Sequence, residues 1–142
     1  MTTVRQVLAV KGSHVHTIHP KECVFDALKR MDEEDVGSLV VMDGECLVGI
    51  LTERHYARKV ALKGKTSLAT PVSDIMERDV VVSRPDLTIE ECIAVMSACK
   101  KRHLPVVQGD RLIGIVSLGD MMSSMIGDQK FAIDQMVQYI CS

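Results

Sequence analysis

Two short stretches place a hydroxyl side chain three residues before a titratable one, where an expected strand gives way to an expected helix. In GIVSLGD, residues 114–120, the pair is Ser117 and Asp120. The hydroxyl can cap the helix, and the carboxylate one turn later lies on the same helix face. Such a carboxylate can accept two hydrogen bonds from a cis-diol, as acidic residues do for ribose in other nucleotide-binding folds. Ser117 and Asp120 are therefore candidates for a ribose site, although this spacing more often serves only to cap a helix.

The second stretch, GILTERH at residues 49–55, has Thr52 in the hydroxyl position and His55 in place of the acid. A neutral imidazole offers one ring acceptor and a protonated imidazole offers none, so His55 cannot hold a diol as a carboxylate does. We expect a site around Thr52 and His55 to bind nucleotide weakly, differently or not at all. The sequence thus places the main ligand site at Asp120.

These two stretches are corresponding parts of an internal repeat. Residues 15–57 align without a gap with residues 80–122, which pairs proline with proline and one Gly-Ile dipeptide with the other. Upstream, TVRQVL at residues 3–8 matches PVSDIM at residues 71–76 with a slightly larger offset. Self-similarity of this kind is typical of one structural unit used twice.

Each copy has the pattern of a β-α-β-β-α unit. A short extended segment ends at a proline, which is excluded from the middle of a central strand. An amphipathic helix follows, and then two strands joined by an Asp-Gly or Gly-Asp turn typical of hairpins. A second helix begins at Thr52 or Ser117. The apolar residues with helical spacing are Val24, Ala27, Leu28 and Met31 in the first copy, and Ile89, Cys92, Ile93 and Met96 in the second.

We therefore predict an α/β (α+β) fold in which two pseudo-symmetric repeats pack sheet against sheet, because one such unit is too small to bury its apolar surface alone. The expected parts are a first repeat with its N-terminal segment at residues 1–64, a second repeat at residues 65–126 and a C-terminal helix at residues 127–142. That helix either docks on its own domain or contacts a second copy. The same alternatives apply to the apolar face of Met121, Met122, Met125 and Ile126.

Composition excludes several classes of protein. The net charge is −2, so the chain lacks the excess of positive charge that attracts nucleic acid. Aromatic residues make up only 3%, with no Trp, so it also lacks the aromatic side chains on which bases stack. Its apolar runs are far shorter than the roughly 20 residues of a membrane span. The N-terminus lacks the apolar stretch of a signal peptide, which favours the cytoplasm.

Metal-binding and catalytic patterns are weak. The five cysteines include no C-x-x-C pair, and we interpret them as small apolar residues in a reducing compartment or, for Cys141, as a redox switch. His14, His16 and His19 alternate along an extended segment and are either solvated, phosphate-facing or metal-binding. Nothing assembles a nucleophile–base pair or a convincing metal site, so we expect no catalytic residues and no enzyme.

The sequence of the whole repeat resembles that of the CBS domain, which is named after cystathionine β-synthase and has a regulatory role in that enzyme. The stretch HLPVVQGDRLIGIVSLGD, residues 103–120, is similar to the family pattern, and GILTERHYARK, residues 49–59, differs at one position from the usual GILTERDYARK. Two such domains in tandem form a CBS pair, or Bateman module. The resemblance covers about residues 4–125 and identifies the chain as a stand-alone tandem CBS-domain protein.

The resemblance implies an adenine nucleotide in the clefts between repeats, with AMP, ADP, ATP, NAD(H) and S-adenosylmethionine as ligands across the family, and no required cofactor. In this sequence Asp120 matches the acid that holds the ribose hydroxyls, beside the hydroxyl of Ser117 and the apolar contact of Ile115. Two further segments match positions that contact the adenine or hydrogen-bond to it through the main chain; they are Val36, Gly37 and Ser38, and Ser13, His14 and Val15.

Phosphates require cations, and Arg102 and His103 stand where family members carry basic residues facing them. Arginine offers a bidentate fork for phosphate, and Arg54 is a further candidate. The basic run at residues 100–103 is also explained as a solvated cluster that complements a helix C-terminus.

Two functional hypotheses follow. The first is a non-catalytic sensor, acting as a homodimer, that reports the level of an adenylate or NAD(H) to an unidentified target protein. The alternative is a protein-interaction adaptor whose ligand sites have degenerated, with His55 as a sign of that loss.

Overall fold

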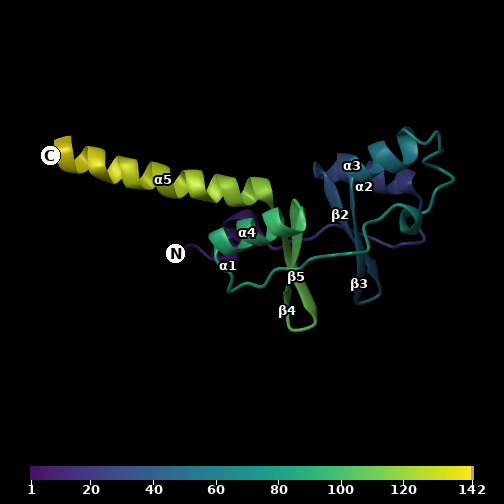
Figure 1. Cartoon of the computed structure of the whole chain (residues 1–142), viewed down its shortest axis with the longest axis horizontal. Coiled ribbons are helices and arrows are strands. Elements are labelled where there is room, and N and C mark those ends of the chain that lie inside the picture. The colour runs from purple at the N-terminus through teal and green to yellow at the C-terminus, as the bar shows by residue number, and fades with distance from the viewer. Residues whose placement is uncertain (142) are drawn as a thin grey trace.

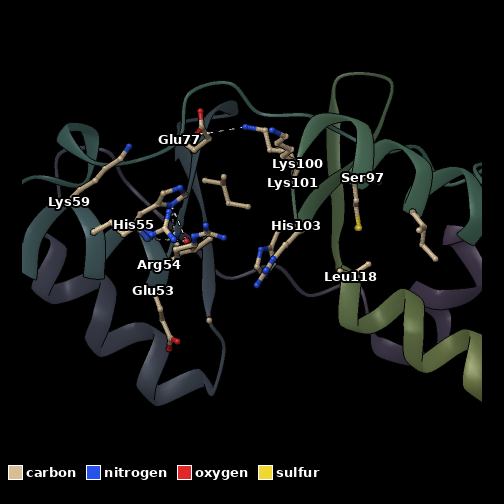
Figure 2. A pocket seen from close by; sticks show the side chains of 17 residues that line it. Glu53, Arg54, His55, Lys59, Glu77, Ser97, Lys100, Lys101, His103 and Leu118 are labelled. Carbon is tan, nitrogen blue, oxygen red and sulfur yellow. Dashed lines mark hydrogen bonds and ion pairs between the residues drawn. The ribbon is translucent and has the colours of Figure 1, made fainter. Parts of the chain in front are cut away.

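The computed structural model describes residues 1–141, without the side-chain surroundings of residues 128, 129, 131, 132, 139 and 141. Two α+β repeats follow one another, as predicted, and in both figures their hairpins stand next to each other in the middle (Figures 1 and 2). The first half contains α1 (Val4–Lys11), β1 (Thr17–Ile18), α2 (Val24–Glu34), β2 (Ser38–Asp43), β3 (Cys46–Thr52), α3 (Glu53–Tyr56) and the π-helix η1 (Ala57–Ala61). The second contains the 3-10 helix η2 (Val72–Asp74), α4 (Ile89–Cys99), β4 (His103–Gln108), β5 (Arg111–Ser117) and α5 (Leu118–Cys141).

The two sheets repeat each other down to their irregularities. Strands β2 and β3 pair antiparallel with a register shift after Val41, and β4 and β5 do so with a shift after Val106. The hairpin turns place Gly44 and Gly109 at the same φ of 63°, a left-handed conformation that glycine adopts without steric cost. The Asp-Gly and Gly-Asp turn predictions are therefore confirmed.

The sheets differ at their first strand. In the first repeat β1 pairs in parallel with β2, and Val40 donates its N–H to the carbonyl of His16. The residue corresponding to Val40 in β4 is Pro105, which has no N–H to donate. The second repeat accordingly keeps only an isolated parallel bridge between Ser83 and Val106.

The hydrophobic core of each repeat includes a segment that lies directly before the other repeat in the sequence, so the two segments cross over. Helix α1 contributes Val4, Val7 and Leu8 to the core of the second repeat, although it lies before the first. The segment around η2 contributes Val72, Ile75 and Met76 to the core of the first. The sequence match between residues 3–8 and 71–76 therefore reflects one structural role filled twice.

Glycines in β3 and β5 make room for these segments. A Cβ atom on Gly49 would lie 2.7 Å from Met76 Sδ, and one on Gly114 would lie 2.7 Å from a methyl carbon of Leu8. Side chains at these strand positions are thus excluded by the docked segments. Packing against these segments therefore explains why each Gly-Ile dipeptide of the repeat has glycine at its first position.

Helix α5 joins the second repeat to the expected terminal helix without a break, from Leu118 to Cys141. Its C-terminal part extends away from the rest of the chain (Figure 1). Of the apolar face for which two alternatives were open, Met121 is fully buried in the second core, as the first alternative has it, whereas Met122 and Ile126 are exposed. The side chain of the candidate redox residue Cys141 lies outside the described part of the structure.

Candidate ligand-binding clefts

Both repeats cap the helix after their second hairpin in the same way. Asp120 Oδ2 accepts the Ser117 N–H at 2.8 Å, and Ser117 Oγ accepts the Asp120 N–H at 3.1 Å. In the first repeat His55 Nδ1 accepts the Thr52 N–H at 3.0 Å, and Thr52 Oγ1 accepts the His55 N–H at 3.3 Å. The imidazole nitrogen thus takes the structural role of the carboxylate oxygen.

This hydrogen bond fixes the tautomer of His55. A backbone N–H can only donate, so Nδ1 carries no proton and the ring proton of the neutral form resides on Nε2. Burial lowers the pKa of His55, and the charges of Lys59, Lys101 and Arg54 lower it further against the opposing effect of Glu77. His55 is therefore a neutral side chain at neutral pH, with Nε2–H as its remaining polar group.

A cleft of about 950 Å³ lies between the two repeats at His55. One wall comes from β3, α3 and η1, and the other from α4 and the start of β4. Figure 2 shows Arg54 and His55 on one side, and Lys100, Lys101 and His103 on the other. The apolar part of the lining includes Ile50, Ile93, Met96 and Leu118.

The cleft has a strong positive charge. Six lysines and arginines line it against the two acids Glu53 and Glu77, of which Glu77 pairs with Lys101 at 3.7 Å. The backbone N–H of Asp79 has the largest effect on the pKa of Glu77, lowering it, and burial opposes this. Glu77 is therefore ionised, and the cleft retains a formal excess of four positive charges. The six cations are Arg54, Arg58, Lys59, Lys100, Lys101 and Arg102.

Asp120 faces a different partner. Lys11 at the end of α1 donates to Asp120 Oδ2 at 2.6 Å and to the carbonyl of Ile115 at 2.7 Å. Burial acts to raise the pKa of Asp120, but the hydrogen bonds from Lys11 and Ser117 outweigh burial and lower it overall. The predicted ribose acid is thus ionised and held by an ammonium group in this structure.

His103 lies within electrostatic reach of both regions. It lines the His55 cleft, and its pKa is lowered first by burial and then by Lys11 and Arg102, against the raising effect of Asp120. The imidazole is therefore uncharged at neutral pH. It therefore borders the cationic cleft and also responds to the charges of the Lys11–Asp120 pair.

The predicted ligand residues fall into three groups. Five of them line the His55 cleft: Gly37, Thr52, Arg54, Arg102 and His103. Ile115, Ser117 and Asp120 gather around Lys11. The remainder surround these groups or lie apart from them: Val36 packs against the first core, Ser38 pairs with Thr52 across the hairpin, Ser13 and His14 are exposed and Val15 is half-buried.

Several lining residues were not predicted from the sequence. Arg58 and Lys59 follow Arg54 at helical spacing, which was an available signal for one basic face. Lys11 gave no signal, because 109 residues separate it from Asp120. Among the described residues no group of three or more metal-ligating side chains occurs, and His14 instead packs edge-on against His16 with ring centres 4.5 Å apart.

A family model of the CBS domain matches residues 4–62 and again residues 72–127. The chain belongs to the CBS domain family. CBS domain pairs are regulatory modules, often nucleotide-binding, and stand-alone CBS proteins are generally non-catalytic.

Individual CBS proteins are similar over most of the chain. The mitochondrial CBS domain-containing protein CBSX3 of Arabidopsis thaliana is 31% identical over 98% of this chain and 72% of its own length. A CBS-domain-containing protein of Agrobacterium tumefaciens is 33% identical with a TM-score of 0.83, covering 87% and 99% of the two chains. The hexameric CBS-CP12 protein of bloom-forming cyanobacteria is 28% identical with a TM-score of 0.79, covering 99% and 88%. In the described part of the chain, no helix has both the length and the apolar character needed to cross a bilayer.

Proposed function

We propose that this CBS pair is a non-catalytic regulatory module that binds an adenine nucleotide, AMP, ADP, ATP or NAD(H), with Asp120 as the ribose acid. The supporting observation is the ionised carboxylate of Asp120 at the start of α5: the Lys11 ammonium and the Ser117 N–H both donate to Oδ2, so Oδ1 is the oxygen that would first meet a ligand hydroxyl. The second ribose hydroxyl would reach Oδ2 by displacing the ammonium of Lys11. The neighbouring His103 is the side chain that we assign to the phosphates of this nucleotide.

Displacement of Lys11 gives the ligand a means of regulation. Lys11 ends α1, and α1 packs in the core of the second repeat, so releasing its ammonium alters a contact between the N-terminal segment and the ligand site. A ligand shifts such an equilibrium only by its differential affinity for the two arrangements. We propose that this change is what a target protein in the cytoplasm recognises.

The Lys11–Asp120 ion pair also favours the second candidate function, an adaptor without a ligand. An ammonium that satisfies the acid permanently would leave no ribose site. Isothermal titration calorimetry with AMP, ATP and NADH separates the two functions. Binding of at least one nucleotide tighter than about millimolar supports the sensor, and binding of none supports the adaptor.

The site assignment is tested with Asp120→Asn, whose amide oxygen can still accept the capping hydrogen bond. We expect AMP affinity to fall about tenfold or more, since a charge-assisted hydrogen bond is lost. Asp110→Asn, in the exposed hairpin turn, is the matched control and should bind as the wild type does. Unchanged AMP affinity in Asp120→Asn would show that the ribose lies elsewhere.

We infer that two copies associate through α5. Ile126, Ile133 and Ile140 recur at intervals of seven residues and are 62%, 59% and 77% exposed, and the 63% exposed Met136 lies between the last two. A seven-residue apolar repeat is the pattern of a coiled-coil seam, which a second copy of the same helix satisfies. Ile133→Glu should dissociate the homodimer in multi-angle light scattering, whereas Gln135→Glu, another exposed position of α5, should not. A monomeric wild type would refute the interface.

A further inference from the structure

We propose that the cleft at His55 is a second and separate binding site, specific for a chain of three or more phosphates and independent of a ribose diol. The proposal rests on the cations that line the cleft, on the donor that His55 directs to a ligand and on the absence of both from the corresponding positions of the other repeat. It does not depend on nucleotide binding at Asp120.

Most cations of the cleft lack a counter-charge. Four of the six, Arg54, Arg58, Lys100 and Arg102, form no side-chain hydrogen bond or ion pair with any described residue. Like charges collected in one cleft repel each other, and an anion relieves this repulsion while gaining charge-assisted hydrogen bonds. The formal excess of four positive charges suits a tri- or tetra-anionic phosphate chain better than a single phosphate.

His55 sets the polarity of the site. Its Nδ1 is engaged by the Thr52 N–H, so its contribution to a ligand is the Nε2–H donor. A phosphate oxygen accepts such a hydrogen bond, whereas a ribose diol would meet a donor where the acid of the other repeat offers an acceptor. The site is thus predicted to select for phosphate and to be indifferent to the sugar.

Each repeat contributes three of the six cations, and none of them has a charged counterpart of the same sign at the aligned position of the opposite repeat. Shifting the six cations by 65 residues gives no lysine or arginine, and Ser97 aligns with Asp32 in the same comparison. The two cap positions are therefore specialised, His55 for phosphate and Asp120 for a ribose hydroxyl. The aligned residues are Gly119, Ser123, Ser124, Asp35, Val36 and Gly37.

The size of the cleft allows either source of a phosphate chain. Ligand sites typically enclose about 300–1,000 Å³, and the volume of about 950 Å³ leaves room for more than the phosphates. An inorganic triphosphate and a nucleoside triphosphate share the recognised group. We therefore titrate the full-length protein with inorganic triphosphate, ATP, 2′-deoxy-ATP and AMP at about 0.15 M salt.

We expect inorganic triphosphate to bind with one site per chain, and ATP and 2′-deoxy-ATP to compete with it equally well. Arg54→Gln and Arg102→Gln should each weaken triphosphate about tenfold or more, because each removes a charged donor. Arg84→Gln, whose arginine pairs with Asp86 on the surface, is the control and should leave affinity unchanged. Thermal unfolding of each variant checks that the fold is retained.

Three outcomes overturn the proposal: no triphosphate binding, wild-type triphosphate affinity in both cleft variants, or a strong preference for ATP over 2′-deoxy-ATP at this site. The Asp120→Asn variant keeps the two proposals separate. If it loses AMP but retains triphosphate, both sites stand. If triphosphate fails while AMP still binds and depends on Asp120, only the polyphosphate site is refuted.

Discussion

The two helix caps of this module have the same backbone geometry and opposite chemistry. Thr52 with His55 and Ser117 with Asp120 form the same reciprocal pair of hydrogen bonds within about half an ångström. The fold requires only an acceptor at the third helical position, which an imidazole nitrogen or a carboxylate oxygen supplies equally well. What faces the ligand then changes from an acceptor to a donor, so the two repeats can diverge in function while their structure is preserved.

The largest effect is expected from exchanging the two side chains, in His55→Asp with Asp120→His. Both caps keep an acceptor, so the protein should fold. AMP should then prefer the cleft at position 55 and triphosphate should bind there at least about tenfold more weakly, because a carboxylate repels phosphate. Calorimetry measures both affinities and their stoichiometry. The single variant His55→Asp should raise AMP stoichiometry, and an unchanged value would mean that the cap residue does not decide ligand class.

A medium effect is expected from comparing the two packing glycines. Gly49→Ala and Gly114→Ala should each destabilise the fold by about 1–3 kcal/mol through overpacking. The change at Gly49 should cost more, because its new Cβ would lie 3.0 Å from the main-chain oxygen of Glu77 as well as near Met76. At Gly114 the close neighbours belong to the Leu8 side chain, which can move. Urea unfolding measures the difference, and a larger cost at Gly114 would contradict this account.

The smallest effect concerns pH. The folded-state pKa of His55 lies below its ordinary value of 6.5, so the unfolded chain binds protons first as pH falls. The contribution of His55 to the free energy of unfolding is therefore fully present above pH 6.5, and it is lost as the pH falls through the folded-state pKa. The corresponding loss at Asp120 begins only below its ordinary pKa of 3.8.

His55→Gln removes the titrating group of the first cap and should flatten the curve of stability against pH below pH 6.5. Lys11→Met should reduce stability at neutral pH, since it removes the partner that lowers the pKa of Asp120. It should also lessen the part of the pH dependence that comes from His103, because Lys11 lowers the pKa of that imidazole. Urea midpoints measured across this pH range test both expectations. Parallel curves for wild type and His55→Gln would contradict the first.

The fold was largely predictable because local signals and the repeat agreed. Thr52 and Ser117 cap the helices that follow them, as predicted, and the hairpin turns occur at the predicted glycines. The shortened first strand of the second repeat depends on Pro105, a residue whose effect appears only once its partner strand is known. The crossing of α1 into the second core was not predictable from segment order.

The candidate site was predictable only in part. The motif indicated Thr52, Ser117 and Asp120 because each of them interacts with a residue only three positions away in the sequence. Arg54 and Arg102 were named as phosphate candidates, but their place in one cationic cleft at His55 was not visible in the sequence. The two walls of that cleft come from segments around residues 54–59 and 100–103, and only the packing of the repeats brings them together. The ion pair between Lys11 and Asp120 depends on long-range placement in the same way.

The crossed segments also determine how the chain can come apart. A cut in the connection between η1 and η2 would leave one fragment carrying α1, which the second core needs, and another carrying η2, which the first core needs. Neither half can therefore complete its core alone, and the two fragments should associate and refold only when mixed. The module is in this sense a self-complementing pair, in which melting either half exposes the apolar surface of the other.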